Sequence, residues 1–127
     1  MFRSVIAMTV LVASGHATTQ VVSLECRYSS FTKPVTYILD LASRSGSVHY
    51  GSWDSQGGRS FSATSVKPDP GMITIRYSTG PSQGWDTISR TDLTAQQCYV
   101  GKNATTPANG YCEDGTCTLV ENSPTKF

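Results

Sequence analysis

Histidine, carboxylates and aromatic rings are the side chains of this sequence that could take part in chemistry. His49 could act as a general base if Asp54 and one of the many serines lay beside it. No Gly-x-Ser-x-Gly elbow is present, and His49 alternates with Val48 and Tyr50, so it is expected to point outward from a strand. A small hydrolase is therefore an alternative hypothesis and not the leading one.

The carboxylates are spread along the chain and none forms an obvious pair. Those placed at predicted turns and strand ends are Asp40, Asp54, Asp69, Asp86 and Asp92. Asp69 and Asp92 belong to a residue type that favours turns. Glycoside hydrolysis needs two carboxyl groups that face each other across the scissile bond. The positions of these carboxylates in the sequence predict no such pair, so the sequence does not indicate a glycosidase.

Tryptophan and tyrosine are better candidates for contact with a partner. Trp53 comes just before the loop-like segment 55–58, and Trp85 follows a glycine. Loops are frequent binding positions, and exposed Trp and Tyr anchor sugars, peptides or proteins. Packing of the same rings in a core is the simpler alternative. The predicted contact residues are Trp53, Trp85, Tyr50 and His49.

The cysteines indicate disulfides. Cys26, Cys98, Cys112 and Cys117 are an even number in a chain that reads as exported. Of the three possible pairings, we predict Cys112–Cys117, a local bridge across a turn-like segment, and Cys26–Cys98, which ties the first strand to the last main strand. A zinc site is not expected because no Cys-x-x-Cys pair is present. No motif for another cofactor is found.

Residues 1–17 have the layout of a signal peptide. Arg3 is followed by an apolar run from Val5 to Val12, and Gly15-His16-Ala17 places small residues where a signal peptidase reads. The run is far shorter than the roughly 20 residues that span a bilayer, so no stable membrane anchor is predicted. We expect the mature chain to be exported, either to a periplasm or to the outside.

Charge narrows the range of partners. The chain has 10 Lys plus Arg and 9 Asp plus Glu, and loss of Arg3 with the signal peptide makes the two totals equal. A neutral domain without a run of basic residues is not typical of a nucleic-acid binder. Long-range charge is also not expected to capture the partner. The expected partner is a protein or a small ligand.

The elements that must position these side chains are short strands. Apolar residues alternate with polar ones, as at Val22, Leu24 and Cys26, and Gly, Pro, Ser and Asn separate the runs. The pattern predicts an all-β antiparallel meander of about six to eight short strands. Either a small barrel or a two-sheet sandwich, stapled by disulfides, fits it. The β domain is assigned to residues 18–101, and residues 102–127 read as a polar tail with a small disulfide-closed hairpin.

Short motifs resemble a group of small exported bacterial β proteins. These motifs are Leu24-Glu25-Cys26, Ile73-Thr74-Ile75, and Ile88-Ser89-Arg90-Thr91 before Cys98, within about residues 23–102. The group usually has a glycine after the threonine, where this chain has Asp92. The resemblance implies a β fold and export, and most members have no assigned activity.

A second resemblance is to small-barrel periplasmic lysozyme inhibitors. Those carry a Ser-Gly-x-x-Tyr segment on an exposed loop, and the segment Ser45–Tyr50 is similar to it with one residue more. The leading hypothesis is an exported, non-enzymatic domain that binds through loops at one end of a β scaffold. Inhibition of a hydrolase such as lysozyme is the second hypothesis, and a small hydrolase is the third.

Overall fold

The computed structural model describes residues 21–51 and 58–120, and the regular elements among them are all β-strands. Each strand pairs antiparallel with the next, and the last pairs with the first, so the sheet closes into a barrel. The expected all-β meander is confirmed, and the barrel is the closure that forms. In chain order the strands are β2 (Val21–Tyr28), β3 (Val35–Asp40), β4 (Ser45–Tyr50), β5 (Arg59–Pro68), β6 (Met72–Ser78), β7 (Ser82–Ser89), β8 (Thr94–Gly101) and β9 (Tyr111–Leu119).

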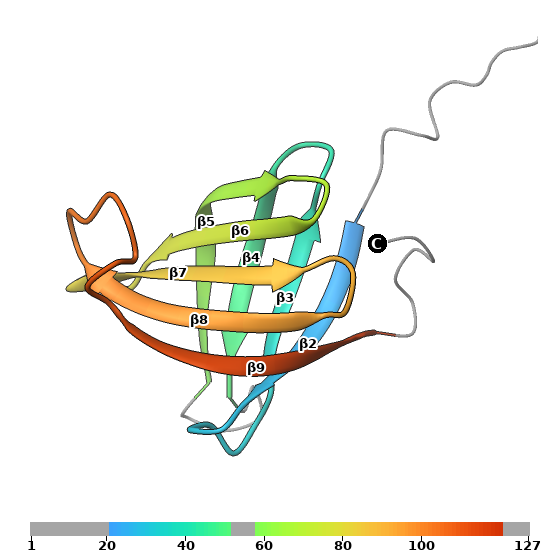
Figure 1. The fold of residues 1–127 in the computed structure, drawn as a ribbon, viewed down its shortest axis with the longest axis horizontal. Helices are drawn as coiled ribbons and strands as arrows, with labels where there is room; N and C mark the ends of the chain where they lie inside the picture. Colours follow the sequence, from blue (N-terminus) through green and yellow to red (C-terminus); the bar gives the residue numbers. More distant parts are fainter. Residues whose placement is uncertain (1–20, 52–57, 121–127) are drawn as a thin grey trace, which may run out of the picture.

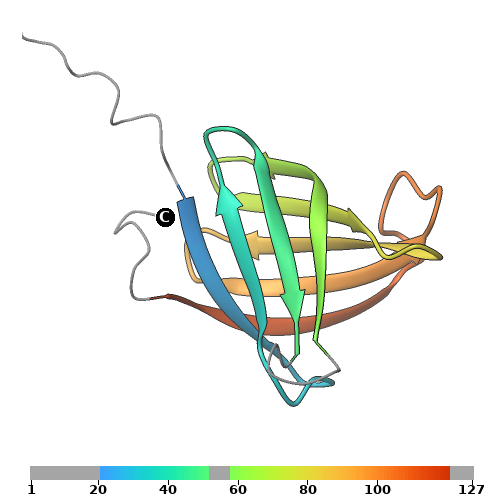
Figure 2. The ribbon, with the colours of Figure 1, turned by 180° about the vertical axis from the view of Figure 1, so that it is seen from behind.

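The barrel has two sets of strands that cross each other. In Figure 1, β2 to β5 run close to vertical and β6 to β9 run close to horizontal. Seen from behind in Figure 2, β2 to β5 lie side by side in front of the other four. A register shift between Ala63 and Ser65 interrupts the pairing of β5 with β6. Such irregularities bend a strand and help a sheet to close.

Alternation in the sequence decides which side chains enter the barrel. On β6, Ile73, Ile75 and Tyr77 are fully buried, whereas the residues between them are only partly covered. The same period of two on β2 buries Leu24 and Tyr28. Successive side chains on a strand point to opposite faces, so one apolar face per strand fills the interior.

Two glycines make room for tyrosine rings in the interior. A Cβ atom on Gly84 would lie 2.1 Å from Cζ of Tyr77, and one on Gly115 would lie 2.5 Å from Cδ1 of Tyr28. Each glycine is the cross-strand partner of the tyrosine that it accommodates. An eight-stranded barrel is barely wider than its own side chains, so these glycines decide where large rings fit.

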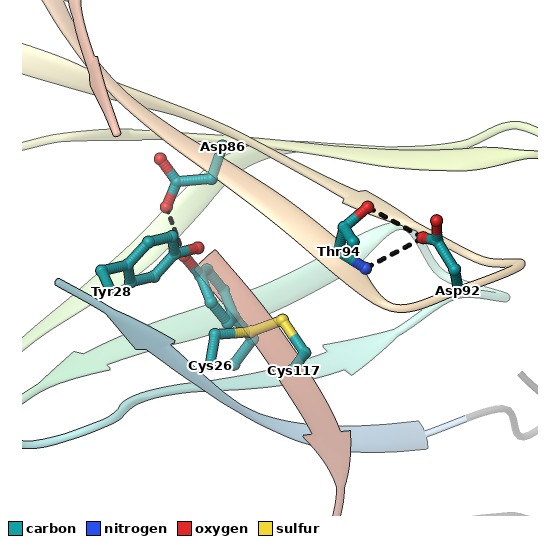
Figure 3. Close-up of a disulfide and its surroundings, with 7 residues drawn as sticks. Cys26, Tyr28, Asp86, Asp92, Thr94 and Cys117 are labelled. Atoms are coloured by element: carbon teal, nitrogen blue, oxygen red, sulfur yellow. Dashed lines mark hydrogen bonds between the residues drawn. A yellow bond between two sulfur atoms is a disulfide. The ribbon is translucent and has the colours of Figure 1, made fainter. Parts of the chain in front are cut away.

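The predicted disulfide pairing is wrong. The bridges are Cys26–Cys117 and Cys98–Cys112, and each joins directly opposed residues on neighbouring strands. Cys112 and Cys117 lie five positions apart on β9, so their side chains point to opposite faces and cannot meet. Cys26–Cys117 lies inside and fastens β2 to β9, which is the seam that closes the barrel (Figure 3).

Part of the segment predicted as a polar tail, residues 102–127, belongs to the barrel. Tyr111–Leu119 forms β9, which pairs with both β8 and β2. Its polar sequence hid the strand, because Gly115, Cys117 and Leu119 are the inward positions and only the last is a large apolar residue. The predicted signal peptide lies outside the described residues. Within the part of the chain that is described, no helix is long and apolar enough to cross a bilayer.

Candidate functional site

A buried carboxylate stands inside the barrel. Asp86 lies in the middle of β7, in phase with Ile88, and both side chains are fully buried. Its Oδ2 accepts hydrogen bonds from the hydroxyls of Tyr37 at 2.6 Å and Tyr77 at 2.8 Å. Figure 3 shows Asp86 in the interior near Tyr28. The expectation that Asp86 lies at a turn or strand end is wrong, and its shared phase with Ile88 was the signal for an inward position.

Burial sets the protonation of this group. Loss of water raises the pKa of Asp86 to about 7, and the hydrogen bonds from Tyr37 and Tyr77 oppose that rise. Burial also raises the pKa of Tyr37 and Tyr77 far above the usual range. The phenols therefore stay protonated at neutral pH, while Asp86 is close to its midpoint.

Further tyrosines extend the hydrogen-bond network toward one end of the barrel. The hydroxyl of Tyr50 bonds that of Tyr77, and the hydroxyl of Tyr99 donates to Tyr50 at 3.2 Å. Gln97 Nε2 donates to the Tyr99 hydroxyl at 2.8 Å. On the other side of Asp86, Tyr28 bonds Tyr37 at 2.9 Å. A continuous chain of polar groups thus leads from the core to the residues that line an open end.

That end is the mouth of the barrel, and it contains a cavity of about 550 Å³. This volume lies in the range of small-molecule sites. Aromatic rings pack along its wall, with the Phe31 and Tyr50 centroids 5.7 Å apart and those of Tyr50 and Phe61 5.6 Å apart. The described lining residues are Phe31, Thr32, Lys33, Tyr50, Gly51, Arg59, Phe61, Thr79, Pro81 and Tyr99.

The charge at the mouth is positive. Lys33 and Arg59 line the cavity, and none of the described lining residues is acidic. The Arg59 guanidinium lies 5.6 Å from the centroid of the Phe61 ring. The nearby Glu113 is engaged elsewhere, since its carboxylate accepts hydrogen bonds from Ser29 and Ser30 in the β2–β3 turn. These bonds, those from Ser30 first, lower the pKa of Glu113 and keep it ionised.

The predicted contact residues do not come together. Tyr50 lies at the mouth, half-buried and facing the cavity. Trp85 is on the outer wall, where the Arg76 guanidinium stacks 4.2 Å from its ring centroid. His49 is also on the outer wall, on β4. Trp53 lies outside the described residues. Of the three that lie in the described residues, Tyr50 alone lines the mouth cavity.

His49 and the buried carboxylate are on opposite faces of the barrel wall. The two ring nitrogens of His49 lie 2.8 Å from Ser47 Oγ and 2.9 Å from Ser60 Oγ. Partial burial lowers its pKa. Because Asp86 points inward and His49 outward, the two do not form a joint acid–base pair.

The segment similar to a lysozyme-inhibitor loop is a strand. Ser45–Tyr50 forms β4 and pairs with β3 on one side and β5 on the other. A strand held by two neighbours does not project a side chain into an enzyme cleft as an exposed loop does. Its last residue, Tyr50, contributes to the site only through the mouth cavity.

Comparisons with known proteins leave the geometry as the basis for function. No family model, no curated protein and no solved structure matches the chain. The hairpin within the bacterial resemblance does form between β7 and β8, with Leu93 at φ 62°. The resemblance itself stays a prediction. Among the described residues, no cluster of three or more His, Cys, Asp or Glu could hold a metal ion.

Proposed function

We propose that the protein is an exported, non-enzymatic binding protein that holds a small aromatic anion in the mouth of its barrel. The observation that carries this proposal is the mouth cavity of about 550 Å³, with aromatic walls and two cationic side chains at its edge. An eight-stranded barrel leaves room for side chains or for one small ligand. The cavity at the mouth is of a size that fits such a ligand.

The walls favour a flat, apolar body. Phe31, Tyr50 and Phe61 present ring edges and faces to the cavity, with centroid separations typical of aromatic pairs. A planar ligand adds one more ring to such a cluster and removes apolar surface from water. Each favourable aromatic pair is worth roughly 0.5–1.5 kcal/mol beyond the buried area.

The edge favours negative charge. Lys33 reaches the cavity from the loop between β2 and β3, and Arg59 reaches it from the first position of β5. A carboxylate or sulfonate on the ligand can meet both, and a guanidinium gives two parallel hydrogen bonds to such groups. Because the chain as a whole is close to neutral, this selection is local to the mouth.

The disulfides support the proposed exported location. All four cysteines are paired in disulfides, and such bonds persist in secreted and periplasmic proteins. The predicted signal peptide at residues 1–17 agrees with that location. An exported protein with an aromatic cavity at its mouth suits capture of a small molecule outside the cytoplasm.

Fluorescence titration with anilinonaphthalene sulfonate tests the proposal, because this probe is a flat aromatic anion. The native protein is expected to bind it at one site. The double substitution Lys33→Gln and Arg59→Gln is expected to weaken binding about 10-fold, since two charge pairs are each worth up to about 1 kcal/mol. Phe61→Ala removes part of the aromatic wall and is expected to weaken binding as well.

Lys67→Gln is the matched control, because Lys67 is an exposed cation near the far end of the same strand as Arg59. Its affinity for the probe is expected to equal that of the native protein. The proposal is overturned if the native protein does not bind the probe. Equal affinities in the native and the doubly substituted protein would overturn it too.

A further inference from the structure

The hydrogen bonds that reach the mouth have a fixed direction. The Tyr77 hydroxyl donates its one hydrogen to Asp86 Oδ2 at 2.8 Å. In the bond between Tyr77 and Tyr50, the hydrogen must therefore come from Tyr50. Tyr99 donates to Tyr50 at 3.2 Å, and Gln97 Nε2 donates to Tyr99 at 2.8 Å. Every hydrogen in this series of hydrogen bonds therefore points toward Asp86.

The consequence appears at Tyr50 and Tyr99, which line the cavity. The hydroxyl hydrogen of each is committed to the chain, so what each can still offer is an oxygen lone pair. Acceptor groups prefer a ligand that donates. A ligand group that can only accept would meet these two oxygens without a hydrogen between them, and a ligand acceptor that leaves water and finds no donor costs about 1–3 kcal/mol.

We infer that the ligand of the mouth carries a hydroxyl or N–H at the end opposite its anionic group, so that it donates to Tyr50 or Tyr99 while the anion meets Lys33 and Arg59. This inference rests on the proposed function and narrows its ligand class. The expected molecule is a flat aromatic acid with a hydrogen-bond donor at its far end.

The hydrogen bonds from Tyr50 and Tyr99 keep their direction when Asp86 becomes protonated. Asp86 Oδ1 and Gln97 Oε1 are buried without a hydrogen-bond partner of good geometry, and the two residues are directly opposed on β7 and β8. When Asp86 takes up a proton, Oδ1 is the oxygen that accepts no hydrogen bond and is free to carry it. Oδ2 still accepts from Tyr37 and Tyr77, so the tyrosines need not turn.

Calorimetric titration with three matched acids tests the inference. The probes are phenylpropionate, para-methoxyphenylpropionate and para-hydroxyphenylpropionate, which share the acid and the ring and differ in the far group. The hydroxyl compound is expected to bind about 10-fold more tightly than the other two, at the upper end of the roughly 0.5–1.5 kcal/mol that one net hydrogen bond contributes. Equal affinities for all three acids overturn the inference and leave the proposed function standing. Binding of none of them, together with no binding of anilinonaphthalene sulfonate, overturns both.

Two Tyr→Phe variants separate an effect of the hydrogen-bond chain on ligand preference from a general loss of stability. Tyr77→Phe removes the acceptor of Tyr50, whose hydrogen is then free to turn toward the cavity. The preference for the hydroxyl acid over the methoxy acid is expected to fall below about 3-fold, because the freed Tyr50 hydrogen can then be donated to the methoxy oxygen, which accepts but cannot donate. Tyr28→Phe removes a hydroxyl from the other arm at Asp86 and is expected to keep the full preference. An unchanged preference in Tyr77→Phe contradicts the inference.

Discussion

The two ends of the barrel interior are built from different side chains. One end is the mouth, with the tyrosine chain, Asp86 and the aromatic cavity. The other end, called here the aliphatic end, is formed by Val22, Leu39, Leu41, Ile73 and Ile88, all buried. The same closed sheet supports both. The strands therefore set the frame, and the inward residues of each half decide whether that half stabilises or binds.

The two ends differ because polar side chains need hydrogen-bond partners when they are buried, whereas aliphatic side chains do not. Aliphatic side chains lose nothing when water leaves, so they can fill the closed end densely. Phenols and a carboxylate must bond one another in the interior, since an unpaired polar group is costly there. The network meets that need at the hydroxyls of Tyr37 and Tyr77 and at Asp86 Oδ2, and at the same time it carries polar character to the cavity.

The largest expected effect is a loss of stability without a loss of binding, caused by a substitution at the aliphatic end. Ile73→Ala at the aliphatic end removes a fully buried side chain, and such truncations cost about 3 kcal/mol of unfolding free energy because a cavity remains. Urea denaturation measures this loss. Affinity for anilinonaphthalene sulfonate is expected to stay within about twofold of the native value. Phe61→Ala, at the partly buried mouth, is the counterpart, with a smaller loss of stability and a clear loss of affinity.

The next effect is a rise in stability as pH falls. Asp86 has a pKa of about 7 in the folded protein, against 3.8 as its ordinary value. Between about pH 8 and pH 5.5 the folded state takes up a proton that the unfolded state does not, so the unfolding free energy grows by about 2 kcal/mol. Urea denaturation at a series of pH values measures it.

Asp86→Asn supplies the control for this pH dependence. The amide keeps the shape and cannot ionise, so the rise due to residue 86 is expected to vanish. His49 acts in the opposite sense, because burial lowers its pKa and stability falls as the unfolded histidine becomes charged. That contribution is the same in both proteins and cancels in their difference. Equal pH slopes for the two proteins would show that Asp86 does not titrate in this range.

Alternation made most of the barrel predictable. The inward phase of Val22, Leu24, Ile73 and Ile75 can be read from the sequence, because a strand with one buried face has a period of two. Closure could not be read in the same way. Whether the sheet forms a sandwich or a barrel depends on the pairing of β9 with β2, and the apolar pattern on β9 is too weak to reveal that strand.

The candidate site was harder to predict because its key groups are polar residues in the core. Asp86 reads as a surface carboxylate by type, and only its phase with Ile88 places it inside. Tyr99 and Tyr50 meet through strands that are far apart in the sequence. The disulfides could have been narrowed by the same rule of phase, because the odd spacing of Cys112 and Cys117 puts them on opposite faces.

The smallest expected effect concerns the turns, which also differ between the two ends. Among the described residues, left-handed backbone angles occur at Arg44 and Leu93 near the aliphatic end, and at Gly51 and Gly80 near the mouth. An L side chain in this conformation costs about 1–2 kcal/mol, and glycine avoids the cost but loses more entropy on folding.

Arg44→Gly is therefore expected to raise stability by about 0.5 kcal/mol, because Arg44 is exposed and has φ 57°. Gly80→Ala is the reverse test at the mouth, where φ is 99° and no atom lies within 4 Å of the added Cβ. Its loss of about 1 kcal/mol would come from the backbone alone. Thermal melting measures the change in stability of both variants. A gain for Gly80→Ala, or a loss for Arg44→Gly, would mean that contacts at these turns outweigh the backbone cost.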